Sequence, residues 1–187
     1  MKTMKTTMAS LFLMMGLFGL MDNSNAQNTK LTRQELKEAR KTELTMNFNI
    51  LDSLLNAKSF VLEADYLQGR YGDRIPVMSN LNFIKVNEST GILQTGSSFS
   101  QGYNGVGGVT AEGAIDSWKV YKDAKRMNYT VHFSLITNIG HYDVLLNVSA
   151  NTRASATITG LWPGRLTWDG HLVTIDNSRV FKGQNTI

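Results

Sequence analysis

From Ser59 onward, apolar and polar residues alternate with a period of two, which is typical of strands with one buried face. In the first such segment, Phe60, Leu62 and Ala64 fall on one face and acidic residues fall on the other. Tight turn signals separate the segments and no helical pattern lies between them, which indicates antiparallel pairing. The predicted strands are Phe60–Leu67, Ile75–Met78, Leu81–Val86, Ile92–Thr95, Val109–Glu112, Ile115–Lys122, Met127–Ile136, His141–Ala150, Ser155–Leu161, Leu166–Trp168 and His171–Ile175.

Two of these segments, Met127–Ile136 and His141–Ala150, fit each other best. A four-residue loop between them places Phe133 opposite Val144. In that register the apolar faces of both strands coincide, whereas a slip of one residue would separate them. We therefore expect this hairpin to form the centre of the sheet.

Two turns are expected near the C-terminus. Trp162-Pro163 is expected to enter a turn. Asp169-Gly170 is a two-residue hairpin signal, because both residue types tolerate the positive φ angles that such a turn requires. The sequence therefore predicts a hairpin that ends one strand at Trp168 and begins the next at His171.

One helix precedes the strands, from Arg33 to about Ala57. Thr32 and Glu35 have the spacing of a capping box. Apolar residues three and four positions apart, such as Leu44 and Phe48, form one stripe towards the C-terminal half of the helix. The fold class we predict is mainly β, an antiparallel β-sandwich or flattened barrel with one N-terminal α-helix.

The first 26 residues have the three parts of a secretory signal peptide. Lys2 and Lys5 precede the apolar run 11–20, and small residues stand at Ser24 and Ala26. The run is shorter than the roughly 20 residues that a membrane-spanning helix needs. We expect cleavage near Ala26, a periplasmic or secreted location, and no transmembrane segment in the mature chain. The predicted organisation is a signal peptide (1–26), an N-terminal helical segment (27–58) and an antiparallel β domain (59–187).

The chain has no cysteine, which excludes disulfides, thiolate metal sites, a cysteine nucleophile and a lipidated N-terminal cysteine. The formal net charge is +4, and many basic residues lie within 30–41, interleaved with glutamates. This pattern is typical of a solvated helix face, so we expect no nucleic-acid partner.

Four strings in this order resemble the domain of unknown function family 4251 (DUF4251). They are SFVLEAD at 59–65, LNFIKV at 81–86, NGVGGVTAEG at 104–113 and VFKG at 180–183. The resemblance covers residues 32 to 185, and the glycine-rich string is its most specific part. It implies a periplasmic or outer-surface location, since the family is known from exported proteins of Gram-negative anaerobes. It implies no activity, substrate or catalytic residue.

The glycine-rich stretch 96–108 is the candidate binding loop. The segment that follows it has a strand pattern, which disfavours a dinucleotide loop because such a loop leads into a helix. Its glycines are expected to serve backbone shape, with positive φ at Gly107-Gly108. Phe99, Tyr103 and Asn104 are the candidate ligand-binding residues, because they offer stacking and hydrogen bonds to a glycan or peptide.

The sequence does not indicate catalysis or a cofactor. His132, His141 and His171 lack the spacing of paired zinc ligands, so no metal is expected. No Gly-x-Ser-x-Gly nucleophile motif occurs. Carboxylates that could form a glycosidase pair lie on predicted strands, but nothing in the sequence selects two of them. They are Glu63, Asp65, Glu112, Asp116 and Asp143.

We therefore expect an exported cell-envelope protein that acts as a non-enzymatic binding or interaction module. The first alternative is a β-barrel carrier of a small apolar ligand, which predicts a cavity lined by residues such as Phe133, Leu146 and Tyr142. The second alternative is an envelope hydrolase, which predicts carboxylates or histidines converging in a cleft. The partner is an unknown protein, glycan or small apolar molecule.

Overall fold

The computed structural model describes residues 32–99, 102–161 and 164–187. The predicted signal peptide and the predicted turn at Trp162-Pro163 lie outside the described residues. The chain divides into two units, with the boundary between Leu36 and Lys37. No helix in the described ranges is long and apolar enough to cross a bilayer.

Helix α1 spans Arg33–Asn56, and its first residues belong to the first unit. The Glu35 backbone N–H donates to Thr32 Oγ1 at 3.3 Å, and the Thr32 N–H donates to the Glu35 carboxylate at 2.7 Å. These reciprocal bonds confirm the predicted capping box. The Thr32 N–H, and then its hydroxyl, hold the pKa of Glu35 below its usual value, because both stabilise the charged carboxylate.

In the second unit, the C-terminal half of α1 packs against the strands through its apolar stripe. Phe48, Leu51 and Leu55 are buried in the common core, and Leu44 packs against its edge. The helix ends where Lys58 adopts a positive φ of 50° and the chain turns into the first strand. The predicted helix and the predicted buried stripe are both confirmed.

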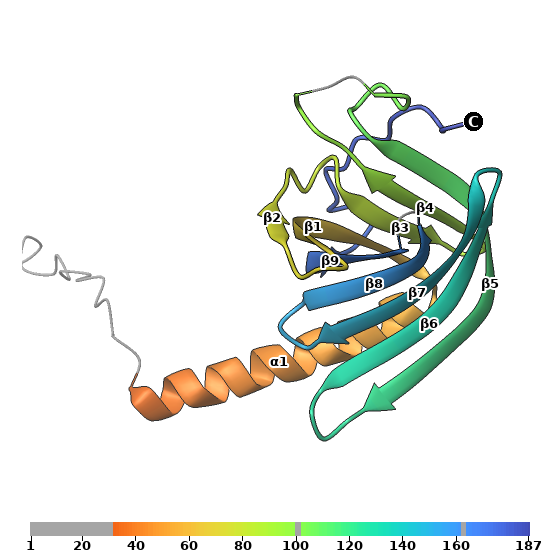
Figure 1. The fold of residues 1–187 in the computed structure, drawn as a ribbon. Helices are drawn as coiled ribbons and strands as arrows, with labels where there is room; N and C mark the ends of the chain where they lie inside the picture. The colour runs from red at the N-terminus through yellow and green to blue at the C-terminus, as the bar shows by residue number, and fades with distance from the viewer. Residues whose placement is uncertain (1–31, 100–101, 162–163) are drawn as a thin grey trace, which may run out of the picture. The chain divides into compact units, whose positions relative to one another are not determined.

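The described strands of the second unit form one antiparallel sheet of nine strands, drawn in Figure 1. The strands are β1 (Ser59–Gly69), β2 (Arg74–Pro76), β3 (Phe83–Asn87), β4 (Thr90–Thr95), β5 (Val109–Asp123), β6 (Asn128–Thr137), β7 (Gly140–Ser149), β8 (Arg153–Leu161) and β9 (Gly164–Val173).

The sheet closes on itself because β1 pairs with β9. From β3 to β9 each strand pairs with the next, and β3 pairs with the first half of β1. Eight strands therefore form a closed barrel, and β2 is an extra strand beside the second half of β1. The predicted antiparallel, mainly β class is confirmed, and of its two forms the barrel is correct and the sandwich is wrong.

The β6–β7 hairpin has the predicted register, with Phe133 opposite Val144 and Val131 opposite Leu146. All four side chains are buried in the barrel interior. The alternation was a reliable guide here because every inward position of both strands carries an apolar residue.

The predicted hairpin at Asp169-Gly170 is wrong, because both residues lie inside the continuous strand β9. Gly170 pairs with Ala64 on β1 and with Ala154 on β8. A Cβ atom at Gly170 would stand only 1.9 Å from the Glu63 carbonyl oxygen. The glycine is therefore needed where two backbones approach closely, not for a turn.

The break predicted between Glu112 and Ile115 is also absent, because both predicted segments belong to the long strand β5. Gly113 lies inside this strand, where a Cβ atom would stand 1.9 Å from the Ile136 carbonyl oxygen. The strand is instead interrupted by a bulge between Asp116 and Lys119, where Ser117 has a φ of +57°.

One end of the barrel is closed by α1. The Tyr129 hydroxyl, near the start of β6, donates to Asp52 at 2.8 Å, and Lys122 lies 3.0 Å from the same carboxylate oxygen. The Tyr129 hydrogen bond, and then Lys122, lower the pKa of Asp52, whereas burial is the main cause that raises the pKa of Tyr129. The ring of Phe48 packs on Tyr129 with centroids 4.8 Å apart.

Candidate binding site at the barrel mouth

The barrel end opposite Tyr129 is formed where β1 and β4 end and where β5 and β9 begin. These strand ends meet because β4 pairs with β5 and β1 pairs with β9. Thr95 pairs with Val109, and Gly69 pairs with Leu166. The site described below lies between these two pairs.

A cavity of about 330 Å³ opens at this barrel mouth. Its volume is at the lower end of the roughly 300–1,000 Å³ that small-molecule sites occupy. We call it the mouth pocket. It is lined by Gly69, Arg70, Tyr71, Leu93, Thr95, Val109, Ala111, Gly164, Arg165, Leu166 and Trp168.

The wall of the mouth pocket is mainly apolar because inward strand positions near the rim carry Leu93, Ala111, Leu166 and Trp168. Small residues create the space, since Ala111 and Gly69 stand where larger side chains would fill the barrel.

Trp168 is the largest side chain of the wall and is only 1% exposed. Its strand neighbours in the barrel are Leu67 on β1 and Ala156 on β8. Among the described residues, its indole Nε1 is the one buried side-chain nitrogen or oxygen without a hydrogen-bond partner. Buried donors are usually paired, so this N–H is an available donor beside the cavity.

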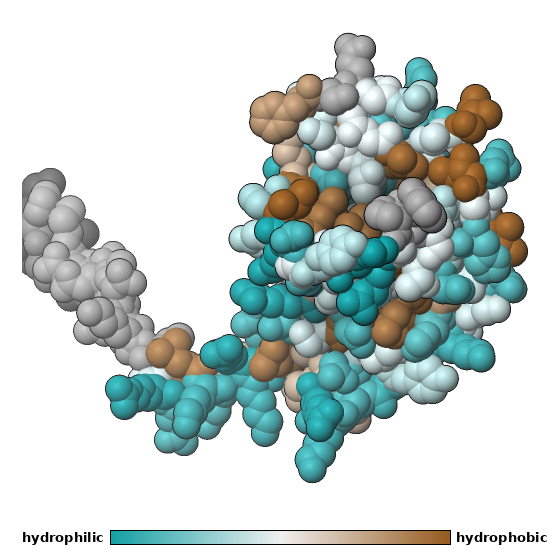
Figure 2. Space-filling model, in the orientation of Figure 1, coloured by the Kyte–Doolittle hydropathy of each residue, from teal (hydrophilic) through white to brown (hydrophobic). Residues whose placement is uncertain are grey.

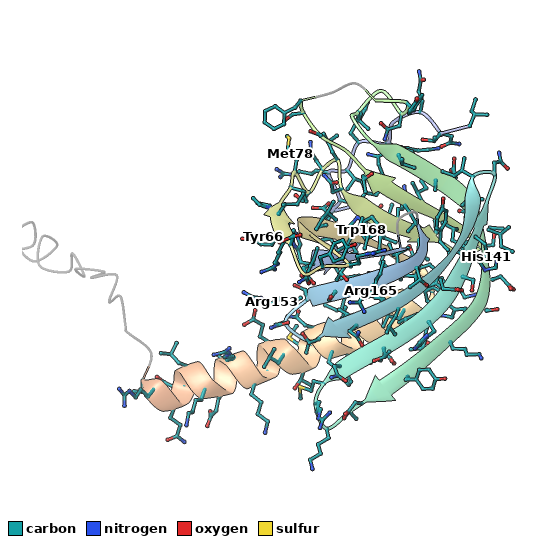
Figure 3. The ribbon with its side chains drawn as sticks, in the orientation of Figure 1. Tyr66, Met78, His141, Arg153, Arg165 and Trp168 are labelled. Atoms are coloured by element: carbon teal, nitrogen blue, oxygen red, sulfur yellow. The ribbon has the colours of Figure 1, made fainter. Side chains whose placement is uncertain are left out.

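The rim of the mouth pocket is cationic and aromatic. Arg70 and Arg165 follow and precede the paired residues Gly69 and Leu166, so they lie on the same side of the opening. The central carbon of the Arg70 guanidinium lies 4.5 Å from the centroid of the Tyr71 ring, and the guanidinium donates a hydrogen bond to the Tyr71 hydroxyl oxygen. Figure 3 labels Arg165 and Trp168, both of which come from β9.

The barrel interior below the mouth pocket is filled. The space among Phe133, Leu146 and their neighbours from β1, β3 and β8 has no room for a water molecule. Tyr142 is buried in the same core cluster. The expectation that a carrier would bind its ligand against Phe133, Leu146 and Tyr142 is therefore wrong, because these side chains pack against each other, and the open space lies at the mouth.

The glycine-rich loop between β4 and β5 separates the three predicted ligand-binding residues. Phe99 is 97% exposed and Tyr103 is 91% exposed, whereas Asn104 is fully buried. The Asn104 side chain accepts from the N–H groups of Val106 and Gly108 and donates to Thr95 O and Thr110 Oγ1. Ligand binding by these residues stays a prediction, and the Asn104 side chain holds the loop in place.

The two consecutive glycines of this loop have different roles. Gly107 has a φ of +78°, as predicted, in a region that disfavours side chains. Gly108 does not have a positive φ, but a Cβ atom there would stand 2.2 Å from the Thr95 carbonyl oxygen. The backbone conformation therefore requires glycine at Gly107, and the close approach of the Thr95 backbone requires it at Gly108. The strand β5 follows this loop, as the sequence predicts.

The C-terminal segment crosses the outer surface beside this loop. The Gln184 N–H donates to the Asn104 carbonyl, and the Thr186 N–H donates to the Thr110 carbonyl. Glu112 on β5 accepts from Lys182 and Asn185, and Lys182 is the main cause that lowers the pKa of Glu112. Glu112, a candidate acid from the sequence, therefore holds the C-terminal segment.

A larger hollow of about 830 Å³ lies on the outer surface over β1, β2, β7, β8, β9 and the start of β6. It contains His171, whose ring nitrogens lie 3.5 Å from Asp65 and 3.8 Å from Glu63. Glu63 also accepts from Ser178 and from the Arg179 N–H. Although this hollow is larger, it is polar and its side chains bond to each other, so we rank it below the mouth pocket as a binding site.

The other candidate groups from the sequence lie apart. Asp143 accepts from Ser134 and lies 3.8 Å from His141, and Asp116 accepts from the neighbouring Ser117. His132 makes an edge contact with Tyr121 on the outer surface. Within the described part of the chain, no three His, Asp or Glu side chains are grouped as a metal ion would require.

Sequence patterns did not reveal the mouth pocket. Leu93, Ala111 and Trp168 look like ordinary core residues in the sequence, and Arg70 and Arg165 look like solvated turn residues. Only the pairing of β1 with β9 brings the two arginines together. The sequence signal that could have suggested a rim is Arg70-Tyr71 at the end of a predicted strand.

Comparison with known proteins gives a family but no activity. The family model described as a domain of unknown function, DUF4251, matches residues 42–172. A crystal structure of a DUF4251 family protein from Bacteroides eggerthii DSM 20697 is 30% identical, with a TM-score of 0.60 over 73% of this chain and 93% of that chain. A search of curated proteins finds no match. The chain therefore belongs to the DUF4251 family.

Proposed function

We propose that this chain is an exported, non-enzymatic binding protein of the cell envelope that holds a small, largely apolar molecule in the mouth pocket. The observation that carries the proposal is an open apolar cavity above a filled barrel interior. Small-molecule sites are typically concave and apolar with few polar groups, and the mouths of β-barrels are among their preferred places.

The energetics favour a ligand of modest size. Burying apolar surface stabilises a complex by about 25 cal/mol per Å², so an apolar group that covers Leu93, Leu166 and Trp168 gains several kcal/mol. The packed barrel beneath gives a rigid wall, which lowers the entropic cost of binding. A ligand therefore does not need to reorganise the core.

The other two functions have weaker support. A protein-interaction module would present a contiguous apolar patch, but on the face drawn in Figure 2 the hydrophobic residues form small separate groups. A hydrolase would place free acids or bases in a cleft. In the outer hollow, Asp169 accepts a hydrogen bond from Ser155 and pairs with Arg74, which gives this acid a structural role.

We expect the neutral fluorescent probe N-phenyl-1-naphthylamine to bind the purified mature protein with a strong rise in emission, because the mouth pocket shields it from water. Ala111→Phe should weaken this binding about tenfold or more, because a ring at that position fills the cavity. Fluorescence titration measures both affinities.

Ala114→Phe on the same strand is the matched control, since Ala114 is exposed and does not line the mouth pocket. Val109→Trp narrows the rim from a partly exposed position and serves if Ala111→Phe does not fold. Undiminished probe binding by folded Ala111→Phe and Val109→Trp proteins would exclude the mouth pocket as the site.

The export part of the proposal rests on the N-terminal sequence and on the location that the family resemblance implies. Protein recovered from the envelope of its native host should begin at Gln27 or within one or two residues of it. Mass spectrometry of the intact protein measures this directly. An intact Met1 on envelope protein would contradict cleavage.

A further inference from the structure

From the charge of the rim we infer that the ligand of the mouth pocket is an amphiphile, with an apolar chain against Trp168 and an anionic head group held by Arg70 and Arg165. This inference rests on the proposed binding function and specifies the chemical class of its ligand.

Among the described residues, the pocket lining carries two arginines and no carboxylate. Arg70 follows β1 and Arg165 is the second residue of β9, and the Gly69–Leu166 pair keeps both at one side of the opening. A Cβ atom built at Gly164 would stand 3.6 Å from Arg70 Cδ, so the Arg70 side chain lies against the start of β9. Guanidinium groups bind carboxylates, sulfates and phosphates with paired N–H donors.

Arg165 also lines a second hollow on the outer surface of β5 to β8. Successive side chains of a strand point to opposite faces, and Leu166 and Trp168 face the mouth pocket. Arg165 lies between the two faces of the rim, where it lines both the mouth pocket and this outer hollow. Among the described residues, no ion pair or hydrogen bond engages its guanidinium, so this charge is available to a head group at the rim.

The polar groups of the pocket lining are mainly hydrogen-bond donors. Besides the two guanidinium groups, Trp168 Nε1 is a buried donor without a partner among the described residues. The hydroxyl groups of the lining accept hydrogen bonds within the protein, Thr95 from the Val109 N–H and Tyr71 from Arg70. A cationic ligand would meet two like charges here, and a neutral ligand would supply acceptors without charge, whereas an anionic ligand supplies both acceptors and the opposite charge.

The test compares three compounds with the same ten-carbon chain below their micelle concentrations: decanoate, decan-1-ol and decyltrimethylammonium. Each competes with N-phenyl-1-naphthylamine on the mature protein. We expect decanoate to bind about three- to tenfold more tightly than decanol, because exposed ion pairs each contribute modestly, and decyltrimethylammonium to bind most weakly. The decanoate advantage should shrink with added salt, and decanol affinity should not change.

Arg165→Gln should remove much of the decanoate advantage over decanol, and Arg165→Lys should retain part of it. Arg153→Gln is the matched control, because Arg153 is exposed in the outer hollow, away from the mouth pocket. Decyl sulfate shows whether the site prefers a carboxylate or another anion. Equal affinities for decanoate and decanol would overturn the inference and leave the binding function intact. Absence of binding by the probe and by all the decyl compounds would overturn both.

Discussion

Gly170→Ala is expected to destabilise the protein by about 3 kcal/mol or more, although the substitution adds a single methyl group. Gly170 lies in β9 between β1 and β8, and the added Cβ would stand 1.9 Å from the Glu63 carbonyl oxygen and 2.8 Å from Ala64 Cα. Both neighbours are backbone atoms, so no side-chain rotation relieves the clash, and the barrel must open locally between β1 and β9.

Gly69→Ala is the matched control for this experiment. Gly69 ends β1, and an added Cβ there meets no atom within 4 Å. The same substitution should therefore change stability by no more than about 1 kcal/mol, and it can stabilise slightly by restricting the unfolded chain. Urea unfolding followed by circular dichroism measures both variants. Equal midpoints for the two variants would mean that the close approach of β1 to β9 is wrong.

Gly170 also explains why the sequence wrongly predicted a hairpin at Asp169-Gly170. Asp-Gly is a hairpin signal only when the flanking segments pair with each other. Here the flanking segments pair with β1 and β8 instead, and β1 has a bulge between Ala64 and Tyr66 beside the close contact. A glycine that permits a turn and a glycine that permits close backbone contact look identical in one sequence.

The closure of the barrel could not be read from alternation either. A strand with one buried face has the same pattern in a sandwich and in a barrel. What distinguishes the two is the pairing of Leu62 with Leu172, residues more than a hundred positions apart. The site depends on the same pairing, because only closure places Arg70 beside Arg165.

The sequence was sufficient to predict those elements whose structure depends on local spacing or on a single buried face. The capping box at Thr32 and Glu35 is local, so it needs no tertiary information. The inward positions are apolar without exception from Tyr129 to Leu135 in β6 and from Tyr142 to Val148 in β7, and a slipped register would expose them. These are the elements whose prediction the structure confirms.

Two substitutions at adjacent positions of β6 test that register through their effect on stability. Phe133→Ala should destabilise the protein by about 3–5 kcal/mol, because it removes a buried ring from a packed interior. Phe133 is 3% exposed, its ring centroid lies 5.1 Å from that of Trp118, and the surrounding space holds no water. Little of the resulting cavity can be refilled, since the neighbouring strands are fixed by closure.

His132→Ala on the same strand is expected to cost about 0.5 kcal/mol or less, because this side chain lies on the outer surface and only its ring edge meets Tyr121. For a domain of this size, each kcal/mol corresponds to a shift of roughly 2–4 °C in Tm. Phe133→Ala should therefore lower the Tm by about 6 °C or more, while His132→Ala should leave it within about 2 °C of wild type. Calorimetry of both variants decides the matter. Similar shifts would mean that β6 does not present Phe133 to the interior and His132 to solvent.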